Sequence, residues 1–110
     1  MISLVENEYQ IGGIKIDDLI GKYNAPLYVY DGNYILKQYQ KLVNAFTVPN
    51  LRINYDCKAL NNLNILRLLK NAGSGLDTVS IQEIWLGLKA GFTPANIIFT
   101  PNGVSLEEID

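Results

Sequence analysis

Hydrophobic residues follow two patterns that alternate along the chain. Short runs rich in β-branched and aromatic residues, bounded by Gly, Pro, Asn or Asp, predict β-strands. Longer segments with apolar residues at helical spacing predict helices. The predicted strands cover residues 26–31, 51–57, 76–79 and 96–100, and the predicted helices cover residues 15–23, 31–46, 62–73 and 80–90.

Each of the three longer predicted helices has an apolar stripe along one side. The second and third stripes are expected to be buried against the predicted sheet. Asp31 is the predicted N-cap of the first helix, and Gly91 is predicted to end the third. The stripes are Ile35, Tyr39, Leu42, Val43 and Phe46, then Ile65, Leu68, Leu69 and Ala72, and finally Ile81, Ile84, Trp85 and Leu88.

The regular order of strand and helix predicts an α/β fold with parallel strands joined by helical crossovers. We expect the N-terminal portion of a (β/α)8 TIM-type barrel, truncated in this chain. Residues 1–24 are predicted to be a lead-in segment with a short helix, and residues 25–110 the first βα units of the barrel domain. Ser105 and Glu108 resemble the capping box of a further helix, so we interpret the chain as part of a larger protein.

Composition and charge exclude several classes of function. The chain has 110 residues, of which 48% are hydrophobic and 18% charged, with a net charge of -2 and no block of basic residues that would bind nucleic acid. No apolar run approaches the length of a membrane span and no secretion signal begins the chain, so a cytoplasmic location is expected. With one cysteine and no histidine, a zinc site of the ordinary His/Cys kind is excluded and no metal is expected.

Candidate chemistry gathers where the predicted strands end. The carboxyl ends of parallel strands meet at one edge of a sheet, and polar clusters follow three of them, at residues 58–62, 77–80 and 100–102. Alternation along residues 51–58 places Lys58 at the end of a polar face with Arg52, Asn54 and Asp56, pointing to the barrel axis. Cys57 falls on the opposite face, where it is expected to be a small core residue.

Several motifs, taken in order, resemble the N-terminal part of the diaminopimelate decarboxylase family. These enzymes use pyridoxal phosphate and have a barrel domain of the alanine-racemase type. The resemblance covers roughly residues 12–110. The motifs are GG at 12–13, APLYVYD at 25–31, NYDCKALNN at 54–62, GSGLDTVSIQE at 73–83, LKAGF at 88–92 and IIFTPNGVSLEEI at 97–109.

The resemblance implies a catalytic role for Lys58, which would hold pyridoxal 5'-phosphate covalently as the internal aldimine. Asp77 and Ser80 would line the cofactor pocket. The full-length protein would be a homodimeric carboxy-lyase acting on a small amino acid, converting meso-diaminopimelate to L-lysine and carbon dioxide. Because the family's phosphate loop and substrate residues follow residue 110, the chain alone is expected to be inactive. An amine attacks a carbonyl only when neutral, so a shielded Lys58 is expected.

Other interpretations of these residues remain open. Ser80 and Glu83 fit an S-x-x-E capping box without any catalysis, and Lys58 alone would be an ordinary surface lysine. Asp56 departs from the family pattern two residues before Lys58, and its carboxylate would favour the charged ammonium. An ornithine, arginine or carboxynorspermidine decarboxylase is an alternative, as is a non-catalytic regulatory relative that keeps the fold.

Overall fold

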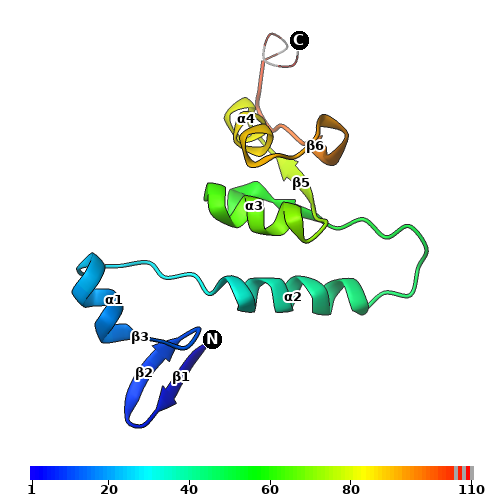
Figure 1. Cartoon of the computed structure of the whole chain (residues 1–110). Coiled ribbons are helices and arrows are strands. Elements are labelled where there is room, and N and C mark those ends of the chain that lie inside the picture. Colours follow the sequence, from blue (N-terminus) through cyan, green and yellow to red (C-terminus); the bar gives the residue numbers. More distant parts are fainter. Residues whose placement is uncertain (106, 108, 110) are drawn as a thin grey trace. The chain divides into compact units, whose positions relative to one another are not determined.

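A computed structural model of the protein describes residues 1–105, 107 and 109 (Figure 1). The chain divides into two compact units, Met1–Gln38 and Tyr39–Asp110, which are described separately. None of the helices in the described part of the chain is long and apolar enough to cross a membrane.

The first unit opens with a small antiparallel sheet. Its strand order is β1-β2-β3, and helix α1 follows directly. The predicted short helix is confirmed as α1, whereas the sheet was not predicted. The elements are β1 (Ile2–Val5), β2 (Glu8–Ile11), β3 (Ile14–Lys15) and α1 (Ile16–Tyr23).

Two tight turns build this sheet. Glu6 and Asn7 join β1 to β2, Gly12 and Gly13 join β2 to β3, and all four residues have positive φ, between 51° and 82°. Two-residue hairpins of the I′ kind require this backbone conformation, which glycine adopts without steric cost. The GG pair between two short alternating runs was therefore the signal for a hairpin.

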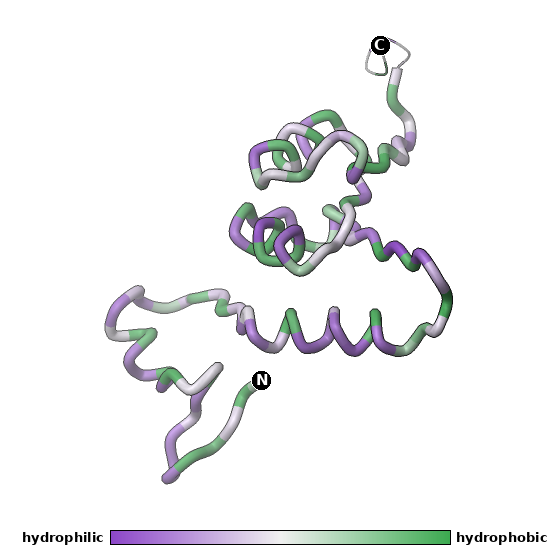
Figure 2. Tube along the Cα trace, turned by 45° about the vertical axis from the view of Figure 1, so that its right-hand side comes forward, coloured by the Kyte–Doolittle hydropathy of each residue, from purple (hydrophilic) through white to green (hydrophobic). Residues whose placement is uncertain are grey.

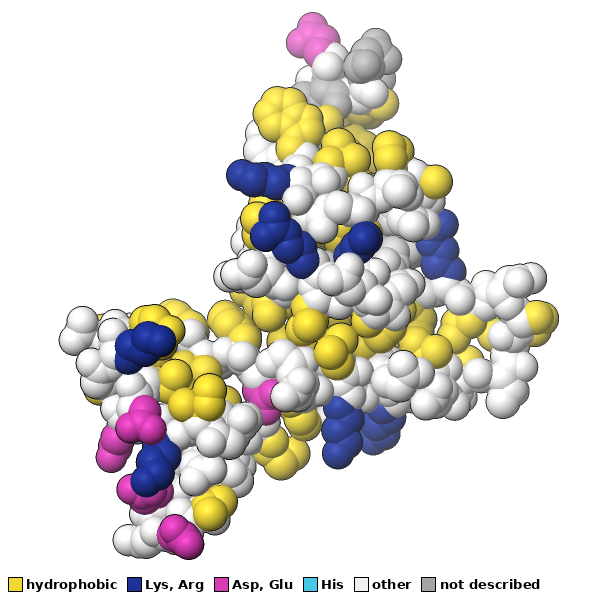
Figure 3. All heavy atoms as spheres, viewed as in Figure 1, with side chains coloured by type: hydrophobic (Ala, Val, Ile, Leu, Met, Phe, Trp, Pro, Cys, Tyr) yellow, Lys and Arg dark blue, Asp and Glu magenta, His cyan; other side chains and the backbone are white. Residues whose placement is uncertain are grey.

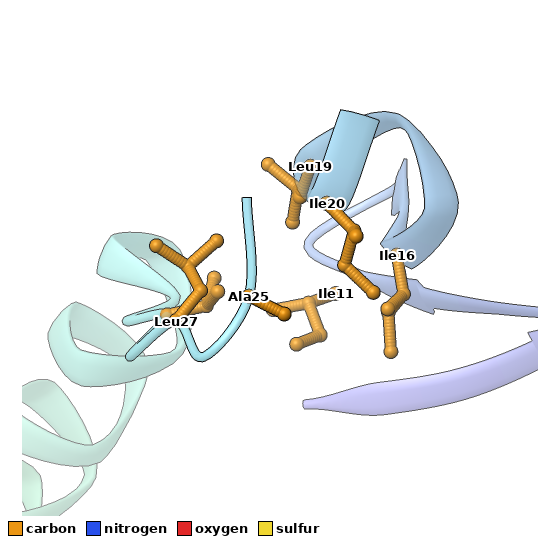
Figure 4. A pocket seen from close by; sticks show the side chains of 7 residues that line it. Ile11, Ile16, Leu19, Ile20, Ala25 and Leu27 are labelled. Carbon is orange, nitrogen blue, oxygen red and sulfur yellow. The ribbon is translucent and has the colours of Figure 1, made fainter. Parts of the chain in front are cut away.

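An apolar pocket lies within the first unit. Figure 4 shows aliphatic side chains of β2, α1 and the segment after α1 around this pocket. No titratable group lines it, so it has the character of a packing surface rather than a site for chemistry. Its lining residues are Ile11, Ile16, Leu19, Ile20, Ala25, Leu27 and Val29.

The strand predicted at residues 26–31 is wrong. Residues 27–31 form no ladder with another strand in the part of the chain that the structure describes. Tyr28 is 89% exposed, and its neighbours Leu27, Val29 and Tyr30 are 38–48% exposed. Strand propensity reports how well side chains fit a pleated, half-buried surface, and here no neighbouring strand supplies that surface.

Helix α2 (Gly32–Asn44) confirms the predicted helix over residues 31–46. Its N-cap is Asp31, whose Oδ1 accepts a hydrogen bond from the Tyr34 N–H at 3.0 Å. Hydrogen bonds from the N-terminal ammonium of Met1 and from this N–H lower the pKa of Asp31. Hydrophobic and hydrophilic positions alternate with the helical period along α2 in Figure 2, yet Leu42 remains 47% exposed among the described residues.

The second unit has the predicted α/β arrangement. Three parallel strands lie in the order β4-β5-β6, and a helix follows each of the first two strands. Two 3-10 turns, η1 and η2, complete it. The elements are β4 (Asn54–Asp56), η1 (Cys57–Ala59), α3 (Leu63–Asn71), β5 (Gly75–Thr78), α4 (Ile81–Ala90), η2 (Pro94–Asn96) and β6 (Ile97–Phe99).

A hydrophobic core fills the space between this sheet and its helices. Leu66 of α3 and Leu76 of β5 have no exposed surface, and full burial of a leucine side chain contributes about 1.5–3 kcal/mol. Leu66 was absent from the predicted stripe of its helix. The cluster comprises Cys57, Leu66, Leu76, Ala90 and Phe92.

Helix α4 contacts the sheet through small residues. Gly87 and Ala90 are its buried positions, and a Cβ added at Gly87 would overlap Cδ2 of Leu76. The predicted stripe of this helix is therefore partly wrong, because Trp85 is 68% exposed and Leu88 is 43% exposed. A helix that approaches a strand this closely needs glycine at the contact, and a pattern of large apolar residues does not reveal that face.

Two further predictions are the lack of a block of basic residues and a capping box near the end of the chain. On the face shown in Figure 3, Lys and Arg side chains lie in several small groups with hydrophobic side chains between them. In the predicted capping box of a further helix, Ser105 is described, whereas Glu108 lies outside the described residues.

Candidate functional site

The carboxyl ends of β4, β5 and β6 form one edge of the parallel sheet. Asp56 pairs in register with Asp77, and Asp77 pairs with Ile98 of β6. Register partners in parallel strands point to the same face, so both carboxylates lie on the face away from the buried core. The structure thus brings together the ends of the three polar clusters that the sequence predicted.

Lys58 lies just beyond this edge, in a different setting from the one predicted. The strand stops at Asp56, and Lys58 is in the 3-10 turn Cys57–Ala59 rather than at the end of a longer strand. Oδ1 of Asp56 accepts a hydrogen bond from the backbone N–H of Lys58 at 3.2 Å. This side-chain cap gives the backbone an alternative to the strand ladder, which explains why the predicted strand ends early.

The Lys58 amine is accessible and paired with an acid. Its Nζ lies 3.1 Å from Oδ2 of Asp56, and the two side chains are 66% and 40% exposed. The expectation that Lys58 would be shielded from solvent is therefore wrong for this structure. Asp56 supplies the negative charge beside this ammonium.

Asp77 is fixed by a hydrogen bond across the sheet. The Thr100 hydroxyl donates to Oδ1 of Asp77 at 2.6 Å, and the Thr100 N–H donates to the carbonyl oxygen of Thr78 at 2.8 Å. The second bond extends the β5–β6 ladder by one residue and holds Thr100 in place. Thr100 had been assigned only to a polar cluster; its position two residues beyond Ile98 on the same face was the signal for its contact with Asp77.

Ser80 and Glu83 form a variant of the capping box that the sequence allowed, in which Glu83 accepts from the residue before the N-cap. Oγ of Ser80 accepts from the Glu83 N–H at 3.3 Å, and Oε2 of Glu83 accepts from the Val79 N–H at 2.7 Å. The structural interpretation of this pair is confirmed. A hydroxyl that accepts one hydrogen bond still has a proton to donate, so Ser80 can cap α4 and bind a ligand as well.

The predicted polar face of β4 divides into two parts. Asn54 shares a face with Asp56, and its side chain lies over Gly75, where an added Cβ would overlap Asn54 Oδ1. Arg52 instead donates to the carbonyl oxygen of Ala95 at 2.8 Å and to Oδ1 of Asn96 at 3.1 Å, at the opposite end of the sheet from Lys58. Arg52 therefore ties the starts of two strands together.

Cys57 faces the core, as predicted. Its side chain has no exposed surface, and burial, with smaller contributions from the charges of Glu83 and Asp56, raises the pKa of the thiol to about 11. A thiol that stays protonated at neutral pH is a poor nucleophile. Among the described residues no group of three His, Cys, Asp or Glu side chains could hold a metal ion.

The edge therefore combines an accessible primary amine, two carboxylates and two hydroxyls. Residues 33–110 match the family described as pyridoxal-dependent decarboxylase, pyridoxal binding domain. The chain belongs to this family. Membership of this family confirms the predicted cofactor, pyridoxal phosphate.

Named relatives of this decarboxylase family support the same assignment. The chain is 41% identical over 101 residues to a diaminopimelate decarboxylase of Methanothermobacter thermautotrophicus, covering 90% of this chain and 24% of the relative. It is 43% identical over 94 residues to a diaminopimelate decarboxylase of Helicobacter pylori, covering 86% and 23%. The chain spans about a quarter of the length of the curated relatives it matches.

Solved structures of the family confirm the fold class. A diaminopimelate decarboxylase from M. jannaschii in complex with L-lysine matches with a TM-score of 0.92 at 30% identity, over 99% of this chain and 26% of that one. A Helicobacter pylori enzyme complexed with L-lysine matches with a TM-score of 0.79 at 40% identity, over 84% and 24%. The chain has the α/β fold of the N-terminal region of these enzymes, a part of the barrel.

Proposed function

We propose that this chain supplies the cofactor-holding lysine of a diaminopimelate decarboxylase. The reaction would convert meso-diaminopimelate to L-lysine and carbon dioxide, with pyridoxal 5'-phosphate bound covalently to Lys58. The observation that carries the proposal is the accessible Lys58 amine, just beyond the edge where Asp77 and Thr100 are joined by a hydrogen bond. The relatives named above support the choice of substrate.

The residues present fit the aldehyde end of this cofactor. Condensation with an aldehyde requires a primary amine that a ring-sized molecule can reach, and the Lys58 side chain is 66% exposed. Asp77, fixed by Thr100, supplies an oriented acceptor on the adjacent strand, and the hydroxyl of Ser80 can donate. When bound, pyridoxal phosphate acts as the electron sink for the charge left by departing carbon dioxide.

Each residue of the chain has a separate task in this proposal. Lys58 holds the cofactor. Asp77 and Ser80 bind its polar groups, and the bond from Thr100 fixes the Asp77 carboxylate in one orientation. The proposal assigns no residue of this chain to the phosphate group of the cofactor or to the substrate.

Trapping with borohydride tests the role of Lys58. The intact protein is incubated with pyridoxal phosphate, reduced, digested and analysed by mass spectrometry. We expect a stable label on Lys58 together with loss of a visible absorbance band on reduction. Lys58→Ala should abolish both signals, whereas the matched variant Lys89→Ala should retain them. An intact protein whose label spreads equally over its lysines would contradict the proposal.

A glycine substitution separates the two roles of Ser80. Glycine is a good N-cap that costs only a few tenths of a kcal/mol relative to serine, but it has no hydroxyl. If Ser80 contacts the cofactor, Ser80→Gly weakens pyridoxal phosphate binding by several-fold while the melting temperature stays almost unchanged. Unaltered binding would leave Ser80 with its capping role alone.

One observation favours a second candidate, a non-catalytic regulatory relative. Oδ2 of Asp56 lies 3.1 Å from Nζ of Lys58, so the structure shows this amine paired with an acid rather than free to attack a carbonyl. An intact protein without the borohydride label would support this candidate. Release of carbon dioxide from meso-diaminopimelate, ornithine, arginine and carboxynorspermidine, compared at equal concentration, identifies the substrate. A homodimer and a cytoplasmic location are further parts of the proposal.

A further inference from the structure

We infer that Asp56 is a positioning residue that controls how fast Lys58 reacts with carbonyl compounds. One carboxylate contacts Lys58 twice, through Oδ1 to the backbone N–H at 3.2 Å and through Oδ2 to Nζ at 3.1 Å. The same side chain therefore sets the turn that presents the lysine and the direction in which its amine points.

The two contacts have different chemical effects. The bond to the backbone N–H caps η1 and fixes the Lys58 backbone next to the strand edge. The ion pair with Nζ engages the ammonium, whose nitrogen has no free electron pair. Any lysine ammonium must lose a proton to solvent before it can attack. The Lys58 amine must also separate from Asp56, a step that a lone lysine would not need.

The surroundings of this ion pair indicate that it slows the reaction of Lys58 without preventing it. Both side chains are partly exposed, at 66% and 40%. Exposed ion pairs are weak and are screened by salt, so the amine separates often. Asp77 lies beside Asp56 on the neighbouring strand, but its Oδ1 accepts from Thr100 and no ion pair joins it to Lys58 in the described part of the chain.

The chemistry concerned is the condensation of an amine with an aldehyde. The nitrogen of Lys58 forms a double bond to the carbonyl carbon, the carbonyl oxygen leaves as water, and the ammonium proton passes to solvent. The identity of the natural aldehyde as pyridoxal phosphate rests on the proposed function. The effect of Asp56 on the amine does not, so a small aldehyde can measure it.

Reductive methylation of the intact protein tests this inference. Formaldehyde supplies the carbonyl, cyanoborohydride supplies the hydride that reduces the new C=N bond, and peptide mass spectrometry compares Lys58 with Lys89 in the same molecule. Lys89 is exposed and has no ion pair among the described residues. It therefore corrects for reagent and pH.

Two substitutions separate the contacts. Asp56→Asn keeps an oxygen that can accept from the Lys58 N–H and removes the charge, whereas Asp56→Ala removes both contacts. We expect Asp56→Asn to raise the Lys58/Lys89 ratio by roughly 1.5- to 5-fold, the range for exposed ion pairs. Asp18→Asn, which removes an equal charge from α1, should leave the ratio unchanged.

Salt dependence provides a second readout. In about 1 M salt the screening length falls to roughly 3 Å, so the ratio should rise in the native protein and stay constant in Asp56→Asn. The inference is overturned if Asp56→Asn behaves like the native protein, or if only Asp56→Ala raises the ratio, because Asp56 would then act through the backbone alone. A protein without the pyridoxal label on Lys58 that still shows the Asp56 effect would refute the proposed function and retain this inference.

Discussion

The first unit, Met1–Gln38, has no fully buried side chain among its described residues, whereas the second unit contains the whole described hydrophobic core. In the first unit, tight turns such as Gly12–Gly13 join neighbouring strands, so its contacts are local. In the second unit, the paired strands are parallel, and intervening helices such as α3 connect one strand to the next. Local geometry suffices to form the first sheet, while burial stabilises the second, and stability should therefore concentrate in residues 54–99.

The largest effect should come from opening a cavity in the second unit. Leu66→Ala removes a side chain with no exposed surface and should cost about 2–5 kcal/mol of unfolding free energy. The matched variant Leu4→Ala, at a position 58% exposed in β1, should cost less than about 0.5 kcal/mol. Urea unfolding of the intact protein measures both. Equal losses would show that the two units share one core.

Thiol chemistry sharpens the comparison with little disturbance of the fold. A pKa of about 11 rather than 9.0 lowers the thiolate fraction of Cys57 at pH 8 by about a hundredfold. Iodoacetamide should therefore alkylate Cys57 far more slowly in the native protein than in urea. Rapid native alkylation would mean that the core opens easily.

The same thiol gives a pH dependence of stability. Because the folded state raises the pKa of Cys57, its contribution is fully present below about pH 9 and is lost as pH rises toward 11. Cys57→Ala should remove this alkaline loss while lowering stability at neutral pH. Melting temperatures between pH 7 and pH 11 check the prediction.

Replacing glycine by alanine should have opposite effects on stability in the two units. Gly87→Ala places a methyl group against Leu76 and should cost about 1–3 kcal/mol, because overpacking shifts the helix. Gly21→Ala on α1 meets nothing within 4 Å and should stabilise that helix by up to about 1 kcal/mol. Urea unfolding reports the first change, and hydrogen exchange of the α1 amides reports the second. A stabilising Gly87→Ala would contradict the close contact.

The smallest of these effects concerns helix caps. Oδ1 of Asn62 accepts hydrogen bonds from the N–H groups of Asn64 and Ile65, so Asn62→Ala should cost about 1 kcal/mol. At the start of α1, Lys15 makes no side-chain cap, so Lys15→Ala should lower stability far less than Asn62→Ala, through loss of its exposed ion pair with Glu8. Circular dichroism melts of the two variants test the difference.

The sequence predicted the elements whose signals are local. The helical stripes and caps located all four helices, and the short apolar runs located β5 and β6. The candidate site followed from fold class, since the polar clusters at the ends of parallel strands meet at one edge. The Ser80–Glu83 box could be predicted because both its donors and acceptors lie within one turn.

What sequence could not supply depended on neighbours far along the chain. Residues 26–31 have strand composition but no described partner strand, and the face of α4 was misassigned because Gly87 and Ala90, rather than Trp85, contact the sheet. The early end of β4 has a local cause instead, the hydrogen bond that the Lys58 N–H donates to Oδ1 of Asp56. The sequence predicted that the Asp56 carboxylate would act on Lys58, and only its orientation, with one oxygen bound to the N–H and the other 3.1 Å from Nζ, depended on the three-dimensional structure.

The absence of a side chain at Gly87 reaches beyond the core. This contact sets how deeply α4 sits, and the first turn of α4 carries Ser80 to the edge of the sheet. Bulk at position 87 would push the helix outward and move that hydroxyl away from its place. In a screen for loss of function, substitutions there would imitate damage to the proposed cofactor site even though every polar group of that site remained intact.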